Sequence, residues 1–308
     1  MTVLSAASPP NTRGKKLKPR RRRKWTGWGF VGPFLLVFLF VLVAPVVYAV
    51  YLSLYQDKLI GGNRFAGLAN YTQALGDSQF WTGFERVVLF LVVQVPIMLI
   101  LALAVGLAID SARLHWAPLY RIAIFLPYAV PAVVGALMWG YLYGNQFGFI
   151  ADLNSWFHTT LPNPLDNTLM LPAIGNIVTW EFIGYNMLIF YSALRVIPGD
   201  LFEAAELDNA SQWQIIWHIK LPALRPAILI ATVFSIIGSF QLFTEPSVLY
   251  PLNKDVIGSA YTPNLYAYYL SFNGQEYNYS ATIAIIMGVL TVIVAYAIQR
   301  IGQRKQEA

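Results

Sequence analysis

The sequence predicts an all-α, polytopic membrane protein with six transmembrane helices and one cytoplasmic elbow of short helices. Apolar residues make up 57% of the 308 residues, whereas charged residues make up 12%, about half the share found in an ordinary soluble domain. Six stretches are apolar and long enough to cross the hydrocarbon core of a bilayer, which takes about 20 helical residues. In addition, a polar, helix-forming stretch separates the fourth span from the fifth.

The predicted spans contain residues that interrupt helices. In chain order the spans are Gly29 to Tyr51, Val87 to Ile109, Leu119 to Tyr143, Ile174 to Leu194, Ala227 to Pro246 and Ala281 to Gln299. The first exceeds the apolar region of a signal peptide and lacks a small-residue cleavage site, so we expect it to be a span. Helix breakers occur at Pro45, Pro96, Pro127, Pro131 and Gly184. A membrane protein accommodates such residues where neighbouring helices or a cavity satisfy the freed backbone groups, so we expect kinked helices.

Basic residues predict the orientation. Nine of the 21 Lys and Arg residues lie between Arg13 and Lys24. With the amino terminus inside, 17 basic residues fall on the inner side, and only Lys58, Arg64, Arg86 and Lys254 fall outside, so both termini are predicted to be cytoplasmic. The basic run lacks interleaved aromatic residues, which favours anionic lipid headgroups over nucleic acid as its partner. We expect a basic tail at 1–27, a transmembrane domain at 28–300 and a cytoplasmic tail at 301–308.

The composition argues against several kinds of chemistry. The chain has no cysteine, and its histidines, His115, His158 and His218, have no metal-ligand spacing, so we expect no metal site. No paired carboxylates or nucleophile–base pattern stands out, and we assign no catalytic residue. The phosphate-binding sequence G-x-x-x-x-G-K-[ST] is missing, so ATP hydrolysis would need another polypeptide.

The polar loop at 198–222, which we call the elbow loop, is predicted to begin with a short helix. Asp200 is expected to act as the N-cap, with Glu203 at the third helical position and the helix starting at Leu201. We expect that helix to end near Asp208, because Asn209 is of a type that tolerates a left-handed backbone.

A second short helix is predicted to follow. Ser211 and Gln214 form an S-x-x-Q capping box, and the helix should close before Pro222. One stripe of this helix is formed by Trp213, Ile216, Trp217 and Lys220. Either lipid headgroups or a cytoplasmic protein would cover that stripe, since tryptophan also suits a membrane interface.

The elbow loop resembles the EAA loop of permease subunits in binding-protein-dependent ABC importers. The resemblance is carried by Glu203-Ala204-Ala205, Asn209-Ala210 and Ile219-Lys220-Leu221-Pro222, with the family's spacing. Asn209 replaces the usual glycine, and asparagine also tolerates the left-handed region. Looser similarity to the carbohydrate branch, the relatives of the larger maltose-importer permease, lies in "FAGLANYTQAL", "FLPYAVPAVVGALMWGYLY" and "GYNMLIFYSALRVIPGDLFEAA".

The resemblance implies a non-catalytic subunit of a larger assembly in a bacterial or archaeal cytoplasmic membrane. Its partners would be a second permease, two ATP-binding cassette ATPases that hold ATP and Mg²⁺, and an extracytoplasmic solute-binding protein that delivers a sugar, especially an oligosaccharide. The elbow loop would lie in a cleft of the ATPase, and this chain would bind no cofactor itself. The implied coupling residues are Glu203, Ala204, Ala205, Asp208, Asn209, Ala210, Trp213, Leu221 and Pro222. A capping role for Glu203 is an equally good interpretation.

Polar residues inside spans four and five are the candidates for a solute pathway, because polar groups are costly in lipid. They are Trp180, Glu181, Tyr185, Asn186, Ser239, Gln241 and Glu245. Amide and carboxylate groups beside aromatic rings suit sugars, although hydrogen bonds between helices would also explain them. A secondary transporter and a membrane anchor or membrane enzyme remain as alternatives; the first would show inverted repeats and a midplane ionisable site, the last an acid–base constellation.

Overall fold

The computed structural model describes residues 25–58, 62–111 and 114–307, and it divides into two units, 1–47 and 48–308. The predicted basic tail between Arg13 and Lys24 lies outside the described residues. The first unit contains α1 (Trp25–Phe38), the π-helical turn η1 (Leu39–Val43) and the start of α2 (Ala44–Ser53). These elements join into one apolar helix, Gly27–Ser53, that is long enough to be the first predicted span.

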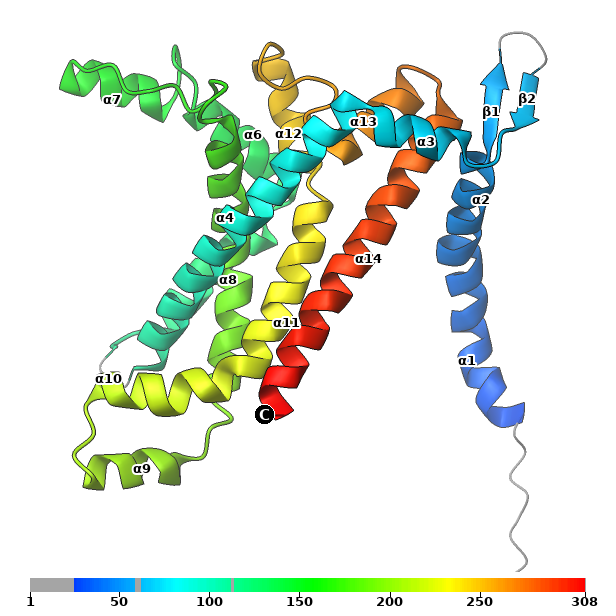
Figure 1. Ribbon diagram of the computed structural model, residues 1–308. Helices are drawn as coiled ribbons and strands as arrows, with labels where there is room; N and C mark the ends of the chain where they lie inside the picture. Colours follow the sequence, from blue (N-terminus) through cyan, green and yellow to red (C-terminus); the bar gives the residue numbers. More distant parts are fainter. Residues whose placement is uncertain (1–24, 59–61, 112–113, 308) are drawn as a thin grey trace, which may run out of the picture. The chain divides into compact units, whose positions relative to one another are not determined.

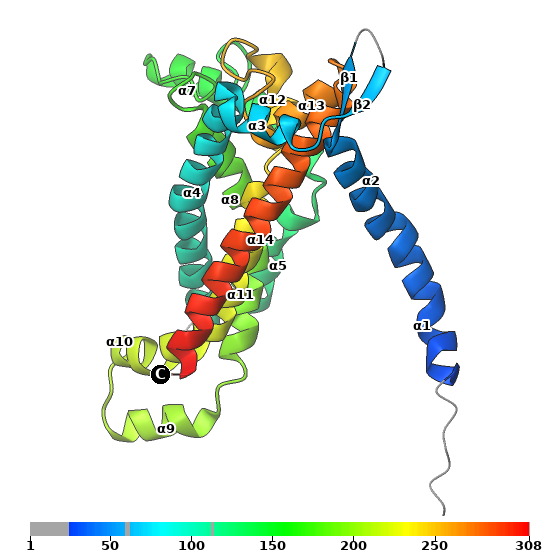
Figure 2. The same cartoon turned by 45° about the vertical axis from the view of Figure 1, so that its right-hand side comes forward.

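Four long helices run through the second unit: α4 (Ser78–Asp110), α8 (Met170–Leu194), α11 (Leu221–Phe240) and α14 (Tyr277–Glu307). In Figures 1 and 2, α9 and α10 lie at one end of these helices, and α3, α7, α12 and α13 lie at the other. The described chain has five helices long and apolar enough to cross a membrane, or six when the bent pair of the third span counts as one. The six-span prediction agrees with this fold.

The second span is longer than its apolar stretch, and Pro96 does not interrupt it. Asp77 caps α4 by accepting hydrogen bonds from the backbone N–H groups of Gln79 (2.9 Å) and Phe80 (3.5 Å), so the helix starts nine residues before the predicted Val87. Its 33 residues correspond to about 50 Å, since an α-helix rises about 1.5 Å per residue. This length exceeds the hydrocarbon core, so the ends of α4 extend beyond it.

The third span is sharply bent, as its prolines suggested. It consists of α5 (Ala117–Phe125), the 3₁₀ turn η2 (Leu126–Ala129) and α6 (Ala132–Leu142), and its halves meet at 96°. Pro127 and Pro131 flank the bend and account for it. Proline donates no backbone hydrogen bond and forces the residue before it out of the helical region. Val130 is accordingly extended, with ψ of 131°.

Gly184 does not break the fourth span; α8 continues through it. Instead, the glycine allows α5 and α8 to approach closely. A Cβ atom at this position would overlap the carbonyl oxygen of Ile124 and lie 2.7 Å from Cα of Phe125. The prediction of a helix breaker was therefore wrong, and the missing side chain serves helix packing.

The long helix of the fifth span ends before the predicted Pro246. Helix α11 stops at Phe240, residues 241–243 are non-helical, and the short helix α12 (Thr244–Leu249) follows before the 3₁₀ turn η4 (Tyr250–Leu252). Gln241 thus lies in a break between two helical segments instead of within one helix. Non-helical backbone at membrane depth is tolerated only where protein or a cavity surrounds it, so the break marks a place to look for a site.

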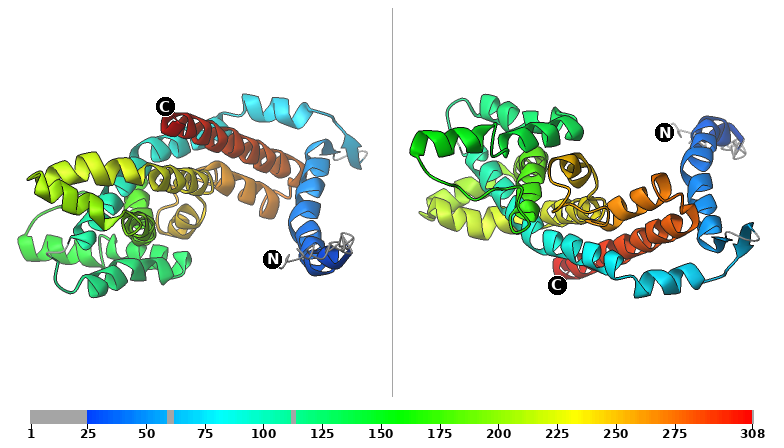
Figure 3. Two further views of the ribbon diagram at one scale, coloured as in Figure 1. Left: turned by 90° about the horizontal axis from the view of Figure 1, so that it is seen from below. Right: turned by 90° about the horizontal axis from the view of Figure 1, so that it is seen from above.

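The end opposite α9 and α10 is closed by short elements, including a small hairpin that an all-α prediction omits. Strands β1 (Tyr55–Lys58) and β2 (Gly62–Phe65) pair antiparallel, with Tyr55 opposite Phe65. The buried Asn70 in α3 (Ala69–Gly76) fixes the hairpin by donating to the carbonyl oxygens of Ser53 (2.9 Å) and Tyr55 (2.7 Å). Helices α7 (Phe149–Phe157) and α13 (Pro263–Phe272) complete this end, and α13 lies alongside α14 in Figure 3.

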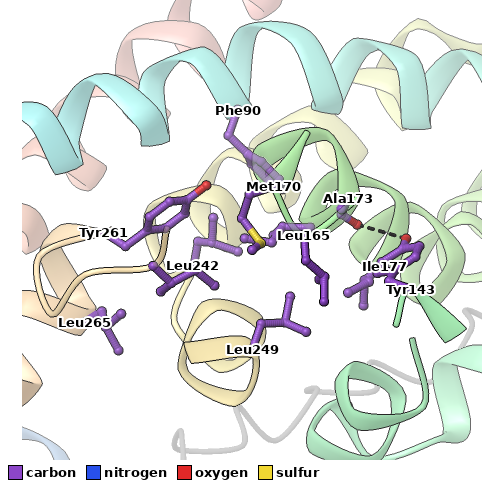
Figure 4. Close-up of a cluster of buried hydrophobic side chains, with 12 residues drawn as sticks. Phe90, Tyr143, Leu165, Met170, Ala173, Ile177, Leu242, Leu249, Tyr261 and Leu265 are labelled. Atoms are coloured by element: carbon purple, nitrogen blue, oxygen red, sulfur yellow. Dashed lines mark hydrogen bonds between the residues drawn. The ribbon is translucent and has the colours of Figure 1, made fainter. Parts of the chain in front are cut away.

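A buried cluster near this end joins segments that are far apart in the sequence (Figure 4). Phe90 of α4 meets Met170 and Ile177 of α8 there, together with Leu249 of α12. The hydroxyl of Tyr143 donates to the carbonyl oxygen of Ala173 at 3.3 Å (Figure 4). The cluster therefore fixes α4, α8 and α12 around the space beside residues 241–243.

Candidate functional site

A cavity of about 420 Å³ lies between α4, η2, α8, α11 and the break at 241–243. Its size falls within the range of about 300–1,000 Å³ that is usual for small-molecule sites. Six of the seven residues predicted for a solute pathway line it: Glu181, Tyr185, Asn186, Ser239, Gln241 and Glu245. The break places Gln241 beside residues of α8 that are more than 50 positions away in the sequence, so the fold gathers these side chains around one space.

Two carboxyl groups line the cavity while almost entirely removed from solvent. Glu181 on α8 is 4% exposed, and Glu245 in the first turn of α12 is 6% exposed. Oε1 of Glu181 has no hydrogen-bond partner and faces Gly135 of α6, where a Cβ atom would lie 2.7 Å from it. Buried charges are normally paired, so two acids in one cavity are a costly arrangement.

Two buried amides, Gln94 of α4 and Asn186 of α8, add further acceptors to the cavity. The Asn186 amide nitrogen donates to the carbonyl oxygen of Phe182 (3.0 Å), and the Gln94 amide nitrogen donates to Oγ1 of Thr179 (3.2 Å). Each amide oxygen is buried and has no partner. The amide N–H groups therefore donate within the protein, and the amide oxygens remain available to accept hydrogen bonds from a ligand.

Aromatic rings form another part of the cavity wall. The rings of Tyr128 in η2 and Tyr185 in α8 stack with centroids 4.9 Å apart, and Tyr128 meets Phe182 edge-on at 5.7 Å. Trp180, the seventh predicted residue, does not line the cavity; its ring lies edge-on to Trp139 with centroids 6.0 Å apart. The Trp180 ring therefore packs against Trp139 of α6, on a side of α8 that is turned away from the cavity.

The sequence reasoning missed Gln94 and Tyr128. Gln94 is the one amide in the apolar stretch Val87 to Ile109, and that isolation is the signal that could have identified it. Tyr128 has no comparable signal, because nothing in "FLPYAVP" reveals that the 96° bend brings its ring onto Tyr185.

The elbow loop at the other end has largely the predicted local structure. Helix α9 (Gly199–Leu207) precedes Asn209, whose φ of +56° is left-handed as predicted, and α10 (Gln212–Ile215) follows. The Ser211 capping box is present: the Gln214 backbone N–H donates to the serine Oγ (3.3 Å), and the Ser211 N–H donates to the glutamine Oε1 (2.7 Å). These two motifs turn the chain between the helices.

Two details of the elbow loop were predicted wrongly. Pro198, not Asp200, occupies the N-cap of α9, and it makes no side-chain cap; Asp200 lies within the first turn, where its charge favours the helix dipole. The second helix also does not close before Pro222. It continues through the π-helical turn η3 (Ile216–Lys220) into α11, because proline is tolerated in the first turn of a helix.

The predicted coupling residues are arranged along this loop. Glu203, Ala204 and Ala205 lie on α9, Asp208, Asn209 and Ala210 form the turn, Trp213 lies on α10, and Leu221 and Pro222 open α11. Trp213 and Trp217 are 66% and 53% exposed, and their rings meet edge-on at 5.7 Å. Large exposed rings on a short loop suit an interface with another molecule.

Lys220, predicted to share a stripe with Trp213 and Trp217, is buried against another part of the chain. Its Nζ forms an ion pair with Oδ2 of Asp110 at 2.6 Å, and both side chains are about one-tenth exposed. The same ammonium lies 5.6 Å from the ring centroid of Phe202 on α9. Lys220 thus connects three parts of the chain: the last residue of α4, the first elbow helix and the start of α11.

Comparison with known proteins places this geometry among transport proteins. The profile of the family described as "Binding-protein-dependent transport system inner membrane component" matches residues 29–307. The lactose transport system permease protein of Rhizobium radiobacter is 29% identical over 284 residues, covering 88% of this chain and 91% of that protein. The trehalose/maltose transport system permease protein of Thermococcus litoralis is 28% identical and covers 96% and 99%.

Solved structures share the fold. A chain of a bacterial ABC transporter involved in the import of the acidic polysaccharide alginate matches with a TM-score of 0.81, 18% identity, and coverage of 91% of this chain and 96% of that one. The alginate transporter in complex with a pentasaccharide-bound periplasmic protein matches with a TM-score of 0.79, 19% identity, and coverage of 92% and 96%.

Proposed function

Because the chain belongs to the family of binding-protein-dependent transport system inner membrane components, we propose that it is the permease subunit of an ATP-driven sugar importer. In this proposal it pairs with a second, homologous permease to form the pathway for an oligosaccharide. Two separate ATP-binding cassette ATPases supply the energy, and an extracytoplasmic solute-binding protein delivers the sugar. Both termini and the elbow loop lie in the cytoplasm.

The observation that carries this proposal is the cavity at the break of the fifth span. A sugar presents hydroxyl groups around its edge and apolar C–H faces, so its site needs hydrogen-bonding groups beside flat rings. The cavity has both: the amides of Gln241 and Asn186 line it, and so does the ring of Tyr185, which stacks on the ring of Tyr128. The relatives named for lactose and for trehalose or maltose support the same solute class.

Transport then requires that the cavity open to each side in turn. A movement of the elbow loop would pass directly into α11, because α10, η3 and α11 are joined without interruption and α11 ends at Phe240, directly before Gln241. We propose that ATP-driven closure of the ATPases tilts the elbow loop and so moves one wall of the cavity, a rigid-body alternation biased by ligands. Glu203, Ala204 and Ala205 would form the contact with the ATPase.

Purification of the tagged protein from detergent-solubilised membranes tests the assembly. We expect a homologous permease and an ATPase in stoichiometric amounts. A homo-oligomer without an ATPase, from a preparation that still transports, would replace the proposal with a secondary transporter.

Uptake by the reconstituted assembly tests the site. Tyr185→Leu and Gln241→Leu should each lower ATP-dependent sugar uptake at least about tenfold, which corresponds to about 1.4 kcal/mol. Tyr120→Leu is the matched control, since Tyr120 is exposed on α5 and outside the cavity. Equal uptake by all three variants would remove the cavity from the pathway.

A further inference from the structure

The cavity contains two buried acids and no base among its described walls. Glu181 and Glu245 both line it and are 4% and 6% exposed, and none of the described residues that line it is Lys, Arg or His. An acid buried in a membrane protein normally pairs with a base or with bound solute. Within the described part of this chain, the walls of the cavity provide no such base.

The neighbouring amides add acceptors instead of donors, and their orientation is fixed by their partners. The Phe182 carbonyl can only accept, so the amide group of Asn186 must turn its nitrogen toward it (3.0 Å). The Thr179 hydroxyl donates to the carbonyl oxygen of Gly175 (2.7 Å), so the Gln94 nitrogen must donate to that hydroxyl oxygen (3.2 Å). The oxygens of both amides, like Oε1 of Glu181, are left without partners.

A ligand that complements these walls therefore brings hydrogen-bond donors and no negative charge. Hydroxyl and ammonium groups are donors, whereas a carboxylate offers only acceptors and would find no base to pair with in the described walls. An unpaired charge costs more free energy as its surroundings become less polar, and the described walls offer no base to a ligand carboxylate. The exclusion of an anion from this buried space is therefore stronger than at an exposed surface.

On the basis of the proposed function, we propose that Glu181 and Glu245 set the charge selectivity of the pathway, which accepts neutral and amino saccharides and rejects saccharides that carry carboxylates. The fold alone does not determine the charge of the transported saccharide, because a solved transporter of the same fold is described as importing an acidic polysaccharide. In this proposal the side chains that line the cavity determine that charge preference.

Saccharide binding to the purified permease complex, without the binding protein, tests the proposal. Three trisaccharide probes are compared by titration calorimetry: maltotriose, the glucosamine trimer and trigalacturonate. We expect the two probes without carboxylates to bind at least about tenfold more tightly than trigalacturonate. In the double variant E181Q/E245Q, this preference should fall by about the same factor, since two acids are replaced by amides that can donate to a carboxylate and the side-chain shapes are kept.

The control variant E85Q/E276Q removes two acids that are exposed and outside the cavity, and it should keep the wild-type preference. A preference that is unchanged in E181Q/E245Q, or tighter binding of trigalacturonate by the wild type, overturns the proposed selectivity. In the latter case the opposing permease would supply the positive charge. Failure of the wild type to bind any of the probes, together with failure of the complete assembly to take up any saccharide, overturns the proposed function itself.

Discussion

The ion pair between Lys220 and Asp110 should hold the elbow loop in place, and its removal should loosen that loop measurably. The two charged atoms are 2.6 Å apart, and each side chain is about nine-tenths buried. Removing one partner of a buried pair leaves the other charge uncompensated and costs about 3–5 kcal/mol. Because the pair lies at the end of α4 and keeps some exposure, we expect about 3 kcal/mol for Lys220→Met.

Hydrogen exchange of the backbone amides at 212–220 measures this loss in the intact assembly. A loss of 3 kcal/mol corresponds to local opening about 150-fold more often, so these amides should exchange correspondingly faster. The variant Asp110→Leu should have a similar effect, whereas the double variant should lose much less than the sum, since apolar pairs often replace buried ion pairs without loss. Losses that add to within about 0.5 kcal/mol would refute the direct coupling of the two residues.

Three further predictions concern local stability. Burial raises the pKa of Asp77, but hydrogen bonds from the hydroxyls of Tyr279 (2.7 Å) and Tyr266 (2.8 Å) and from two backbone amides lower it more, so the pKa lies below its usual 3.8. Its contribution to stability is therefore complete above about pH 5 and is lost as the pH falls through 3.8 to the lowered pKa. The melting temperature of the wild type should accordingly fall below about pH 5, and Asp77→Asn should be less stable at neutral pH and less sensitive to acid. Gly184→Val should separate α5 from α8 and lower the melting temperature of the assembly. Gly288→Val in α14 is the tolerated control, since a Cβ atom added there meets nothing within 4 Å. Ser211→Ala should cost about 1 kcal/mol through loss of the capping box, seen as faster exchange of the Gln214 amide, while an unchanged exchange rate would show that the cap contributes nothing.

The sequence was most informative where structure depends on neighbouring residues. The Ser211 cap and the left-handed Asn209 follow from chemistry within a few positions, and both were predicted. The polar residues of the predicted spans four and five could be chosen as pathway candidates because lipid penalises polar groups regardless of the fold. Six of those seven residues share one cavity, although their role in transport remains a prediction.

Relationships over long distances were not predictable in this way. Asp110 and Lys220 are 110 positions apart, and nothing in either local sequence reveals that they meet. The proline pair in span three predicted a kink but not its size of 96°, which depends on the packing of η2 against α8. The end of α11 at Phe240 was missed because residues 241–243 are not unusual in sequence, and their release from the helix depends on the surrounding cluster.

The measurement that tests the account most directly is ATP-dependent sugar uptake by the reconstituted assembly carrying Glu203→Lys, Ala204→Gly and Ala205→Gly in α9. The account predicts that these changes uncouple transport, so uptake falls while the cavity still binds sugar, because the elbow loop no longer passes the movement of the ATPase to α11. Asp152→Lys in α7, an exposed acid at the other end of the unit, is the charge control and should leave uptake near the wild-type rate. Unchanged uptake by the α9 variant would contradict the central claim that the elbow loop couples this permease to ATP hydrolysis.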